Sequence, residues 1–351
     1  MVDKTYIIGE IGQNHNGSLE LAQQIIDMAT LPVRERLFDL PLRGMDAVKL
    51  TKRDLSYELS ASELKRPYLS KNSFGKTYGE HREALELSDE EHFEIYKYAK
   101  SKGLDFVETL CAPSCLSLLK LFEPDRLKVA SRDLTNLPLL EVMAETKIPI
   151  ILSTGMSGKV ELDQALTIIT RKHSDISILH CVSEYPTQPQ HVNLRTLDYL
   201  FKNYGEYVIG YSDHTIGISV PVSAVAKGAM IIEKHITIDR TLKGTDQKGS
   251  LGIDGVRRMV RDIRLMEMSL GVEDLFIQPE IGDVKLKLER SLATKRDLQK
   301  GESISENDIH LLSPGTGFKW HEKSKVIGRN LRKMIPRNEI ILPEHLDLFN
   351  E

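Results

Sequence analysis

The chain has 351 residues, of which 40% are hydrophobic and 28% charged, and its formal net charge at pH 7 is -4. This length suits a large domain followed by a smaller one, and the charge gives no reason to expect a nucleic-acid or membrane partner. No apolar run approaches the roughly 20 residues that span a bilayer, and the apolar stretch near the N-terminus is too short for a secretory signal. We therefore expect a cytoplasmic protein whose cysteines, Cys111, Cys115 and Cys181, are reduced packing residues rather than metal ligands, nucleophiles or a disulfide framework.

Eight short runs rich in β-branched residues recur through the first three quarters of the chain, and longer amphipathic stretches separate them. The expected strands are Tyr6–Glu10, Ala47–Leu50, Asp105–Thr109, Arg126–Val129, Ile150–Ser153, Ile176–His180, Val208–Ser212 and Met230–His235. Apolar residues at three-and-four spacing predict helices over Leu19–Ala29, Asp89–Lys102, Leu137–Thr146, Lys159–Arg171 and Asp254–Leu270. No glycine-rich dinucleotide fingerprint follows any strand, so the pattern favours a closed (β/α)8 TIM barrel over an open doubly wound sheet.

Two segments are too long for routine connections. Residues 31–43 form an insertion before the second strand, and the sequence assigns it no purpose. Residues 51–87, rich in Lys, Ser, Gly and Tyr, follow the second strand and predict a functional loop over the barrel mouth.

The pattern changes after Leu270, where the βα period stops. The rest of the chain has short strands punctuated by turns and little helix signal. We therefore predict a barrel over residues 1–272, a linker over 273–288 and a small β-rich domain over 289–351.

Polar side chains close the expected strands, at the end of the barrel where such folds place their active sites. Two lysines and four hydroxyl groups have the chemistry of a site that holds a phosphate and a carboxylate together: Lys49, Thr109, Lys128, Ser131, Ser153 and Ser212. The alternative for each residue taken alone is a hydroxyl that merely ends a strand, or a solvated lysine. Taken together, they predict an anion site.

His214 and His235 close two adjacent strands and could share a divalent metal ion such as manganese, iron, cobalt or zinc. The alternative is that each is a hydrogen-bonded core histidine. Asp213 and Glu233 are expected to orient the rings. Glu10 and Asp246 are carboxylates that could act as acid or base or hold sugar hydroxyls, although Asp246 could simply be a turn residue.

Motifs in the order IIGEIGQNHNGSL, DAVKL, LKVASRD, PIILSTGM, LHCVSEYPT, IGYSDHT, EKHIT and KGTDQKGSL cover most of the chain and resemble the sialic acid synthase family. The C-terminal phrases SPGTGF and IGRNLRKMIPRNEII resemble the antifreeze-like (SAF) domain of that family. The resemblance implies a synthase that condenses phosphoenolpyruvate with an open-chain N-acylated aminosugar such as N-acetylmannosamine, with C–O cleavage and release of phosphate. It also implies a dimer in which the SAF domain of one subunit covers the barrel mouth of the other.

The resemblance assigns roles to residues that match its motifs. Phosphoenolpyruvate would be bound by Lys49, Thr109, Lys128, Ser131, Ser153, Ser183 and Ser212. The metal, usually Mn²⁺ with Mg²⁺ or Co²⁺ as alternatives, would be held by His214 and His235. The aminosugar would meet Glu10, Asp246, Tyr185, Thr51 and Asp133, the last in place of a glutamate.

The chain also departs from the family pattern, at positions that bear on the sugar. Thr51 replaces a glutamine, Ser183 an asparagine, and Ser313 an arginine that reaches the acyl group in many members. The identity of the acceptor sugar therefore stays open: it is a precursor of N-acetylneuraminate, legionaminate or pseudaminate, or a phosphorylated sugar. The alternatives in function are a lysine aldolase that uses pyruvate, another metal-dependent barrel aldolase or isomerase, and a non-catalytic sugar-binding protein.

Overall fold

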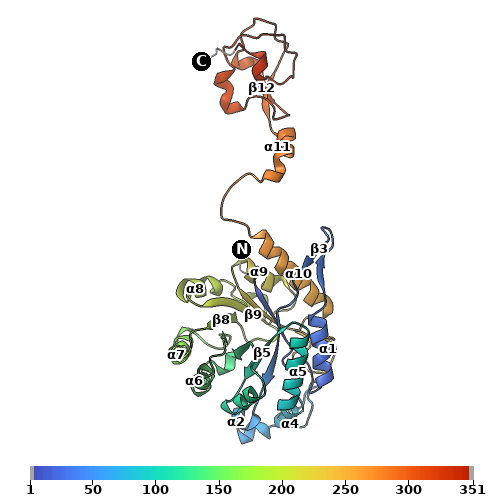
Figure 1. The fold of residues 1–351 in the computed structure, drawn as a ribbon, viewed down its shortest axis with the longest axis vertical. Helices are drawn as coiled ribbons and strands as arrows, with labels where there is room; N and C mark the ends of the chain where they lie inside the picture. The colour runs from blue at the N-terminus through green and yellow to red at the C-terminus, as the bar shows by residue number, and fades with distance from the viewer. Residues whose placement is uncertain (1–3, 348–351) are drawn as a thin grey trace. The chain divides into compact units, whose positions relative to one another are not determined.

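A closed barrel of parallel strands forms the larger part of the protein, as predicted (Figure 1). The computed structural model describes residues 4–347. Going round the barrel, each strand pairs with the next in the order β1-β10-β9-β8-β7-β6-β5-β4. The barrel strands are β1 (Tyr6–Glu10), β4 (Ala47–Lys52), β5 (Asp105–Leu110), β6 (Arg126–Val129), β7 (Ile150–Ser153), β8 (Ile176–Cys181), β9 (Val208–Asp213) and β10 (Ile231–His235).

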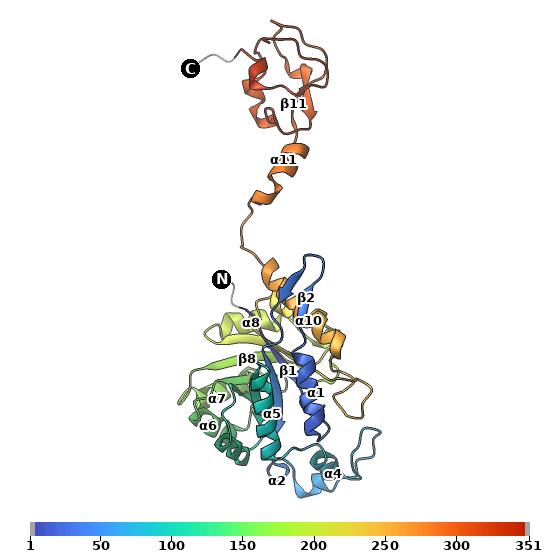
Figure 2. The same cartoon turned by 45° about the vertical axis from the view of Figure 1, so that its right-hand side comes forward.

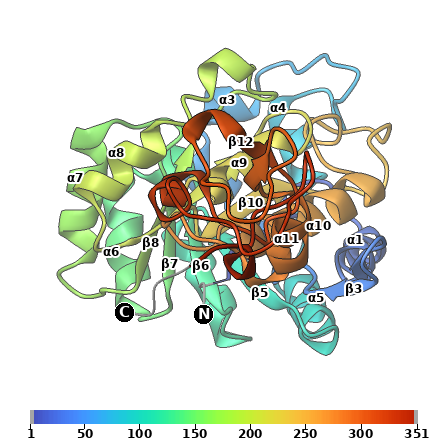
Figure 3. The same cartoon turned by 90° about the horizontal axis from the view of Figure 1, so that it is seen from above.

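Helices follow the strands and surround them. Figure 3 shows α1, α5, α6 and α7 around the outside of the strands. After β5 a 3-10 helix over Pro113–Lys120 takes the place of an α-helix. The barrel helices are α1 (Leu19–Ala29), α5 (Asp89–Ser101), α6 (Leu137–Glu145), α7 (Lys159–Ile169), α8 (Thr196–Asn203), α9 (Ser219–Ala226) and α10 (Ile253–Ser269).

Two layers of apolar side chains hold the barrel. The strands and the surrounding helices share a large core in which Ile25, Phe106 and Ile263 are fully buried. A smaller cluster fills the barrel interior and includes Ile8, Val107 and Leu179. Because the strands are buried on both faces, their sequences are almost continuously apolar until the polar residue that ends each one.

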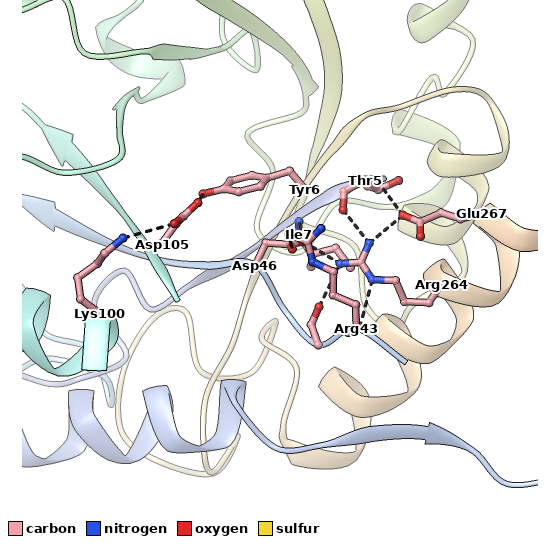
Figure 4. A network of polar contacts seen from close by, with 10 residues as sticks. Thr5, Tyr6, Ile7, Arg43, Asp46, Lys100, Asp105, Arg264 and Glu267 are labelled. Atoms are coloured by element: carbon pink, nitrogen blue, oxygen red, sulfur yellow. Dashed lines mark hydrogen bonds and ion pairs between the residues drawn. The ribbon is translucent and has the colours of Figure 1, made fainter. Parts of the chain in front are cut away.

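A polar network ties α10 to the N-terminal ends of the strands (Figure 4). The guanidinium of Arg264 donates to Asp46 Oδ2 at 2.7 Å, to the Thr5 carbonyl at 2.7 Å and to Glu267 at 2.8 Å. Asp46 also accepts the backbone N–H of Ile7 at 2.8 Å. This network joins β1 and the residue before β4 to the last barrel helix, at the end of the barrel away from the predicted site.

The two unusually long connections are structured. Residues 31–43 contain an antiparallel hairpin, β2 (Val33–Glu35) and β3 (Leu40–Leu42), and β2 lies against α10. Residues 51–87 contain the short helices α2 (Leu55–Glu58), α3 (Ala61–Leu64) and α4 (Tyr78–Glu83). Figure 2 shows α2 and α4 at the end of the barrel away from the β2 hairpin.

The chain divides between Gly271 and Val272 into two compact units. The second unit contains the antiparallel pair β11 (Ser291–Thr294) and β12 (Ile309–Leu312) around a core of its own that includes Leu292, Leu331 and Leu346. Within the predicted linker, residues 273–288, Gly282–Leu288 forms the helix α11. Asp283 in its first turn and Lys285 and Lys287 in its last complement the helix dipole. Within residues 4–347, none of the helices has both the length and the apolar character that a bilayer crossing requires.

Candidate active site

The polar residues that end the barrel strands meet in one cavity of about 310 Å³. The strand register explains why: Glu10 is paired with Lys49 on one side and with His235 on the other, and Thr109 is paired with Lys128. Of the residues predicted from the sequence, those that line this cavity are Glu10, Lys49, Thr51, Thr109, Lys128, Ser131, Ser153, Ser183, Tyr185, Ser212, His214, His235 and Asp246.

Asp133 is the predicted residue that does not line the cavity. Its carboxylate accepts a hydrogen bond from Arg132 Nε at 3.2 Å, and the side chain is buried beside that arginine. The 3-10 turn over Ser131–Asp133 presents Ser131 and Arg132 to the cavity instead. The predicted contact between Asp133 and the sugar therefore has no support in the geometry.

Two buried lysines provide the positive charge of the site. Lys49 Nζ lies 2.7 Å from Glu10 Oε2 and 3.9 Å from Glu233, and it donates to Thr109 Oγ1 at 3.0 Å. Lys128 Nζ donates to Ser153 Oγ at 2.6 Å and to the Val129 carbonyl at 2.9 Å. Each ammonium is thus held by hydroxyl, carboxylate or carbonyl groups of the barrel, so the solvated alternative does not apply to either lysine.

The pKa values of the two buried glutamates, Glu10 and Glu233, are shifted in opposite directions. Burial raises the pKa of Glu10 to about 7, although Lys49 opposes the shift. Burial also acts to raise the pKa of Glu233, but Lys49 and Lys128 outweigh it and lower that pKa to about 2. Glu10 therefore has a pKa suited to proton transfer near neutral pH, whereas Glu233 is a fixed negative charge.

The two predicted metal ligands lie side by side, with ring centroids 5.6 Å apart. His214 Nδ1 donates to the Val182 carbonyl at 2.8 Å, which leaves Nε2 with a lone pair. His235 Nδ1 is buried without a hydrogen-bond partner, and burial lowers the pKa of this imidazole. Two adjacent imidazoles, each with a ring nitrogen free of hydrogen bonds, fit a divalent ion, but residues 4–347 provide no cluster of three or more His, Cys, Asp or Glu ligands. Water and substrate would complete the coordination.

The expectation that Asp213 orients a histidine was wrong. Its carboxylate accepts hydrogen bonds from Tyr211 and Thr215 and pairs with Lys234 at 2.5 Å. Glu233 lies on the cavity and accepts from Ser212 Oγ at 3.1 Å. His180 Nε2, at the end of β8, donates to the Val192 carbonyl at 2.7 Å.

Tyr185 and Asp246 border the histidines. The Tyr185 ring centroid lies 4.1 Å from that of His214 and 6.1 Å from that of His235. The backbone carbonyl of Asp246 accepts from Ser250 Oγ at 2.7 Å, so Asp246 is a turn residue that also lines the cavity.

Several cavity residues were not predicted. Arg53 and Arg82 belong to the long connection after β4, and Arg132 follows the end of β6. Cys181, expected as a packing residue, is buried and also borders the cavity, with Sγ 3.6 Å from Ser131 Oγ. The lysine-rich character of residues 51–87 gave a general signal for the arginines, but no periodicity showed which of them faces inward.

Comparison with known proteins gives a consistent result. The sequence model of the NeuB family matches residues 42–274, and that of the SAF domain matches residues 289–347. The chain is 33% identical to human N-acetylneuraminate-9-phosphate synthase, over 97% of this chain and 92% of that protein. It is 34% identical to N,N'-diacetyllegionaminic acid synthase of Legionella pneumophila, over 97% of this chain and 94% of that protein. Among solved structures, N-acetylneuraminic acid synthetase from Leptospira borgpetersenii aligns with a TM-score of 0.66 and 31% identity, over 80% of this chain and 90% of that one.

Proposed function

The chain belongs to the NeuB family and is a nonulosonic acid synthase, and from this premise we propose that it condenses phosphoenolpyruvate with an open-chain N-acylated aminosugar. The observation that carries the proposal is the gathering of two lysines, a ring of hydroxyls, Glu10 and two histidines in one cavity. The lysines and hydroxyls supply the charge and hydrogen bonds that a phosphate and a carboxylate require. Glu10 and the histidines supply the groups that the reacting carbonyl requires.

The donor binds at the strand ends. Lys128 and the hydroxyls of Ser131, Ser153, Ser183 and Ser212 hold the anionic groups of phosphoenolpyruvate, with Lys49 and Thr109 on the other side. The lysines position the donor and balance its charge; they do not form a Schiff base. Lys49 in particular is paired with Glu10, and although burial opposes its charge, the two nearby glutamates hold its pKa above the ordinary value.

The acceptor binds with its aldehyde near the two histidines. His214 and His235 would hold a divalent metal, Mn²⁺ or alternatively Mg²⁺ or Co²⁺, which acts as a Lewis acid on the aldehyde oxygen when bound. Tyr185, Thr51 and Asp246 border the same space and orient the sugar chain.

The reaction forms one carbon–carbon bond and breaks one carbon–oxygen bond. C3 of phosphoenolpyruvate attacks the aldehyde carbon, whose oxygen takes a proton from Glu10, and positive charge develops at C2. Water adds to C2 and gives a proton to Glu10, whose pKa near 7 allows it to accept one. The tetrahedral intermediate then loses inorganic phosphate to leave the keto acid. Glu233 keeps its negative charge throughout and stabilises the cationic centre.

The test is phosphate release from phosphoenolpyruvate across a panel of N-acylated hexosamines, with the product identified by mass. We expect a product three carbons longer than the acceptor, no reaction when pyruvate replaces phosphoenolpyruvate, and loss of activity with a chelator that a divalent metal restores. Turnover with pyruvate would favour the lysine aldolase, and turnover without a three-carbon donor would favour an isomerase.

Alanine substitution of the histidines tests the metal site separately. His214→Ala and His235→Ala should each weaken binding of Mn²⁺ to the purified protein at least tenfold and lower phosphate release by a similar factor or more. His191→Ala is the matched control, since His191 is exposed and outside the cavity. Unchanged metal affinity in the double variant would remove the metal from the proposal.

A dimer belongs to the same proposal, because the family resemblance implies that the SAF domain of one subunit closes the barrel of its partner. Light scattering should give twice the mass of the chain. Mixing a His235→Ala chain with a chain that lacks residues 272–351 should restore activity that neither has alone.

A further inference from the structure

Three arginines form one wall of the cavity. Arg53 follows β4, Arg82 lies in α4, and Arg132 follows β6. In the closed strand order, β4, β5 and β6 face β8, β9 and β10 across the barrel. The arginine wall therefore stands across the rim from His214 and His235.

The carboxylates that accompany these arginines lie behind them. Glu58 Oε2 lies 2.9 Å from Arg132, 3.8 Å from Arg82 and 4.0 Å from Arg53. Glu86 lies 3.5 Å from Arg53. Asp133 lies 3.2 Å from Arg132, and none of these three carboxylates lines the cavity, whereas all three arginines do. The wall thus presents positive charge to a ligand although the cluster as a whole contains acidic residues.

The hydrogen bonding of the wall is incomplete. Arg53 Nη1 and two nitrogens of Arg82, Nε and Nη2, are buried and have no hydrogen-bond partner. Arg82 is only 8% exposed, and Tyr78 Oη, 2.9 Å from Nη1, accepts one of its hydrogen bonds. These three nitrogens are enclosed by the protein, so a ligand in the cavity contacts the remaining guanidinium surface, most of which comes from Arg132, whose side chain is 34% exposed.

The donor substrate does not account for this wall. Lys49 and Lys128, with the hydroxyls around them, already provide a phosphate and carboxylate site at the strand ends. The arginines stand across the rim from the histidines and line the same cavity, so they are within the space open to the far end of a sugar whose aldehyde lies at the histidines. A neutral hydroxyl at that end would bring no negative charge to a cavity surface that the three arginines make and their carboxylate partners do not reach.

Building on the proposed function, we infer that the natural acceptor is a phosphorylated N-acylated hexosamine whose phosphate, at the end remote from the aldehyde, is bound by Arg53, Arg82 and Arg132. A phosphate monoester carries close to two negative charges and three acceptor oxygens, and the guanidinium fork matches it in a bidentate manner. The residues at the strand ends do not by themselves distinguish a phosphorylated acceptor from a neutral one.

Steady-state kinetics with a matched pair of acceptors tests the inference. With N-acetylmannosamine 6-phosphate, kcat/KM of the natural chain should exceed that with N-acetylmannosamine by at least a hundredfold. Arg132→Gln, the most exposed of the three, and Arg82→Gln should each lower kcat/KM for the phosphorylated sugar by about ten- to a hundredfold, and leave KM for phosphoenolpyruvate and turnover of the neutral sugar within twofold. Arg66→Gln is the control, since Arg66 is exposed in the same connection and pairs with Glu63 outside the cavity.

Binding of unreactive analogues separates this inference from the proposed reaction. The reduced alditol of the sugar phosphate cannot condense, so its affinity for the enzyme saturated with phosphoenolpyruvate is measurable by calorimetry even if no acceptor turns over. We expect Arg132→Gln to weaken the alditol phosphate at least tenfold and to leave the unphosphorylated alditol unchanged. Equal affinity for the two alditols in the natural chain would overturn the inference. So would a rise in KM for phosphoenolpyruvate in the variants, which would assign the wall to the donor, or a preference for a hexosaminuronate, which would assign it to a carboxylate.

Discussion

Gly12 lies where the backbone passes closest to the reactive groups. Its φ is +54°, and a Cβ at this position would stand 2.9 Å from Glu10 Oε1 and 3.3 Å from His235 Cε1. A methyl group here would displace the carboxylate that we assign to proton transfer, and displacements of about 1 Å cost as much as a hundredfold in rate. We expect Gly12→Ala to lower kcat at least tenfold in the phosphate-release assay.

Gly103→Ala is a control for backbone strain at Gly12. Gly103 has a φ of +77°, but no atom lies within 4 Å of the place that a Cβ would occupy. Both variants should therefore lose about 1–2 kcal/mol of stability through the left-handed conformation. If Gly103→Ala lowers kcat as much as Gly12→Ala, steric contact with Glu10 is not the reason.

His15 makes the stability of the barrel dependent on pH. Burial lowers its pKa to about 3, and its Nδ1 accepts the backbone N–H of Gly17 at 3.1 Å. The unfolded chain binds a proton near pH 6.5, so between about pH 6.5 and 3 the unfolded state holds more protons and stability falls as the pH falls. The free energy of unfolding should decrease by about 1.4 kcal/mol per pH unit from this group.

Urea unfolding at pH 7, 6 and 5 measures this slope. His15→Asn offers an acceptor without the titration, so its slope should differ from that of the natural chain by about 1.4 kcal/mol per pH unit. His191→Gln, at an exposed position, should leave it unchanged. A slope in His15→Asn equal to that of the natural chain would contradict the contribution of His15.

At the scale of elements, the contact between α10 and the strands rests on a buried ion pair. Arg264 is 3% exposed and Asp46 6%, and their side chains meet at 2.7 Å. Arg264→Met leaves the buried Asp46 with only the more exposed Arg43 as an ion-pair partner, so it should destabilise the protein by up to about 3 kcal/mol. The double variant Asp46→Asn with Arg264→Met should be more stable than the sum of the two single losses predicts, and additive losses in urea unfolding would show that the pair is not coupled.

The barrel strands were largely predictable because a strand buried on both faces is an almost continuous apolar run that ends at a polar residue. The predicted bounds of Tyr6–Glu10, Arg126–Val129 and Ile150–Ser153 agree with β1, β6 and β7, where short apolar runs are bounded by polar or small residues. The strand-end part of the site followed from the same pattern. The β2–β3 hairpin did not, because strands of three residues on an exposed insertion carry almost no period.

The arginine wall was equally beyond prediction. Arg53 and Arg82 are separated by a stretch of short helices, and only the tertiary path of that connection brings them together. Asp133 shows the converse, since its neighbour Arg132 takes the cavity position that the motif suggested for the carboxylate.

At the scale of the whole molecule, the two units have separate cores. The barrel core ends at Ile263, and the core of the second unit runs from Leu292 to Leu346 with no shared residue. A chain of residues 1–271 should therefore fold and unfold cooperatively on its own, as measured by far- and near-ultraviolet circular dichroism during urea unfolding. If the chain of residues 1–271 gave no near-ultraviolet circular dichroism signal, the tertiary packing of the barrel would depend on residues 272–351.

The ends of the barrel strands form the floor of the cavity, and the connection over residues 51–87 supplies most of its arginine wall. The floor is fixed by the barrel register, so any change there disturbs neighbouring strands as well as the chemistry. The connection that carries Arg53 and Arg82 lies outside the strand ladder of the barrel. Substitutions in this one connection can therefore change the sugar specificity while the residues that form the carbon–carbon bond stay the same.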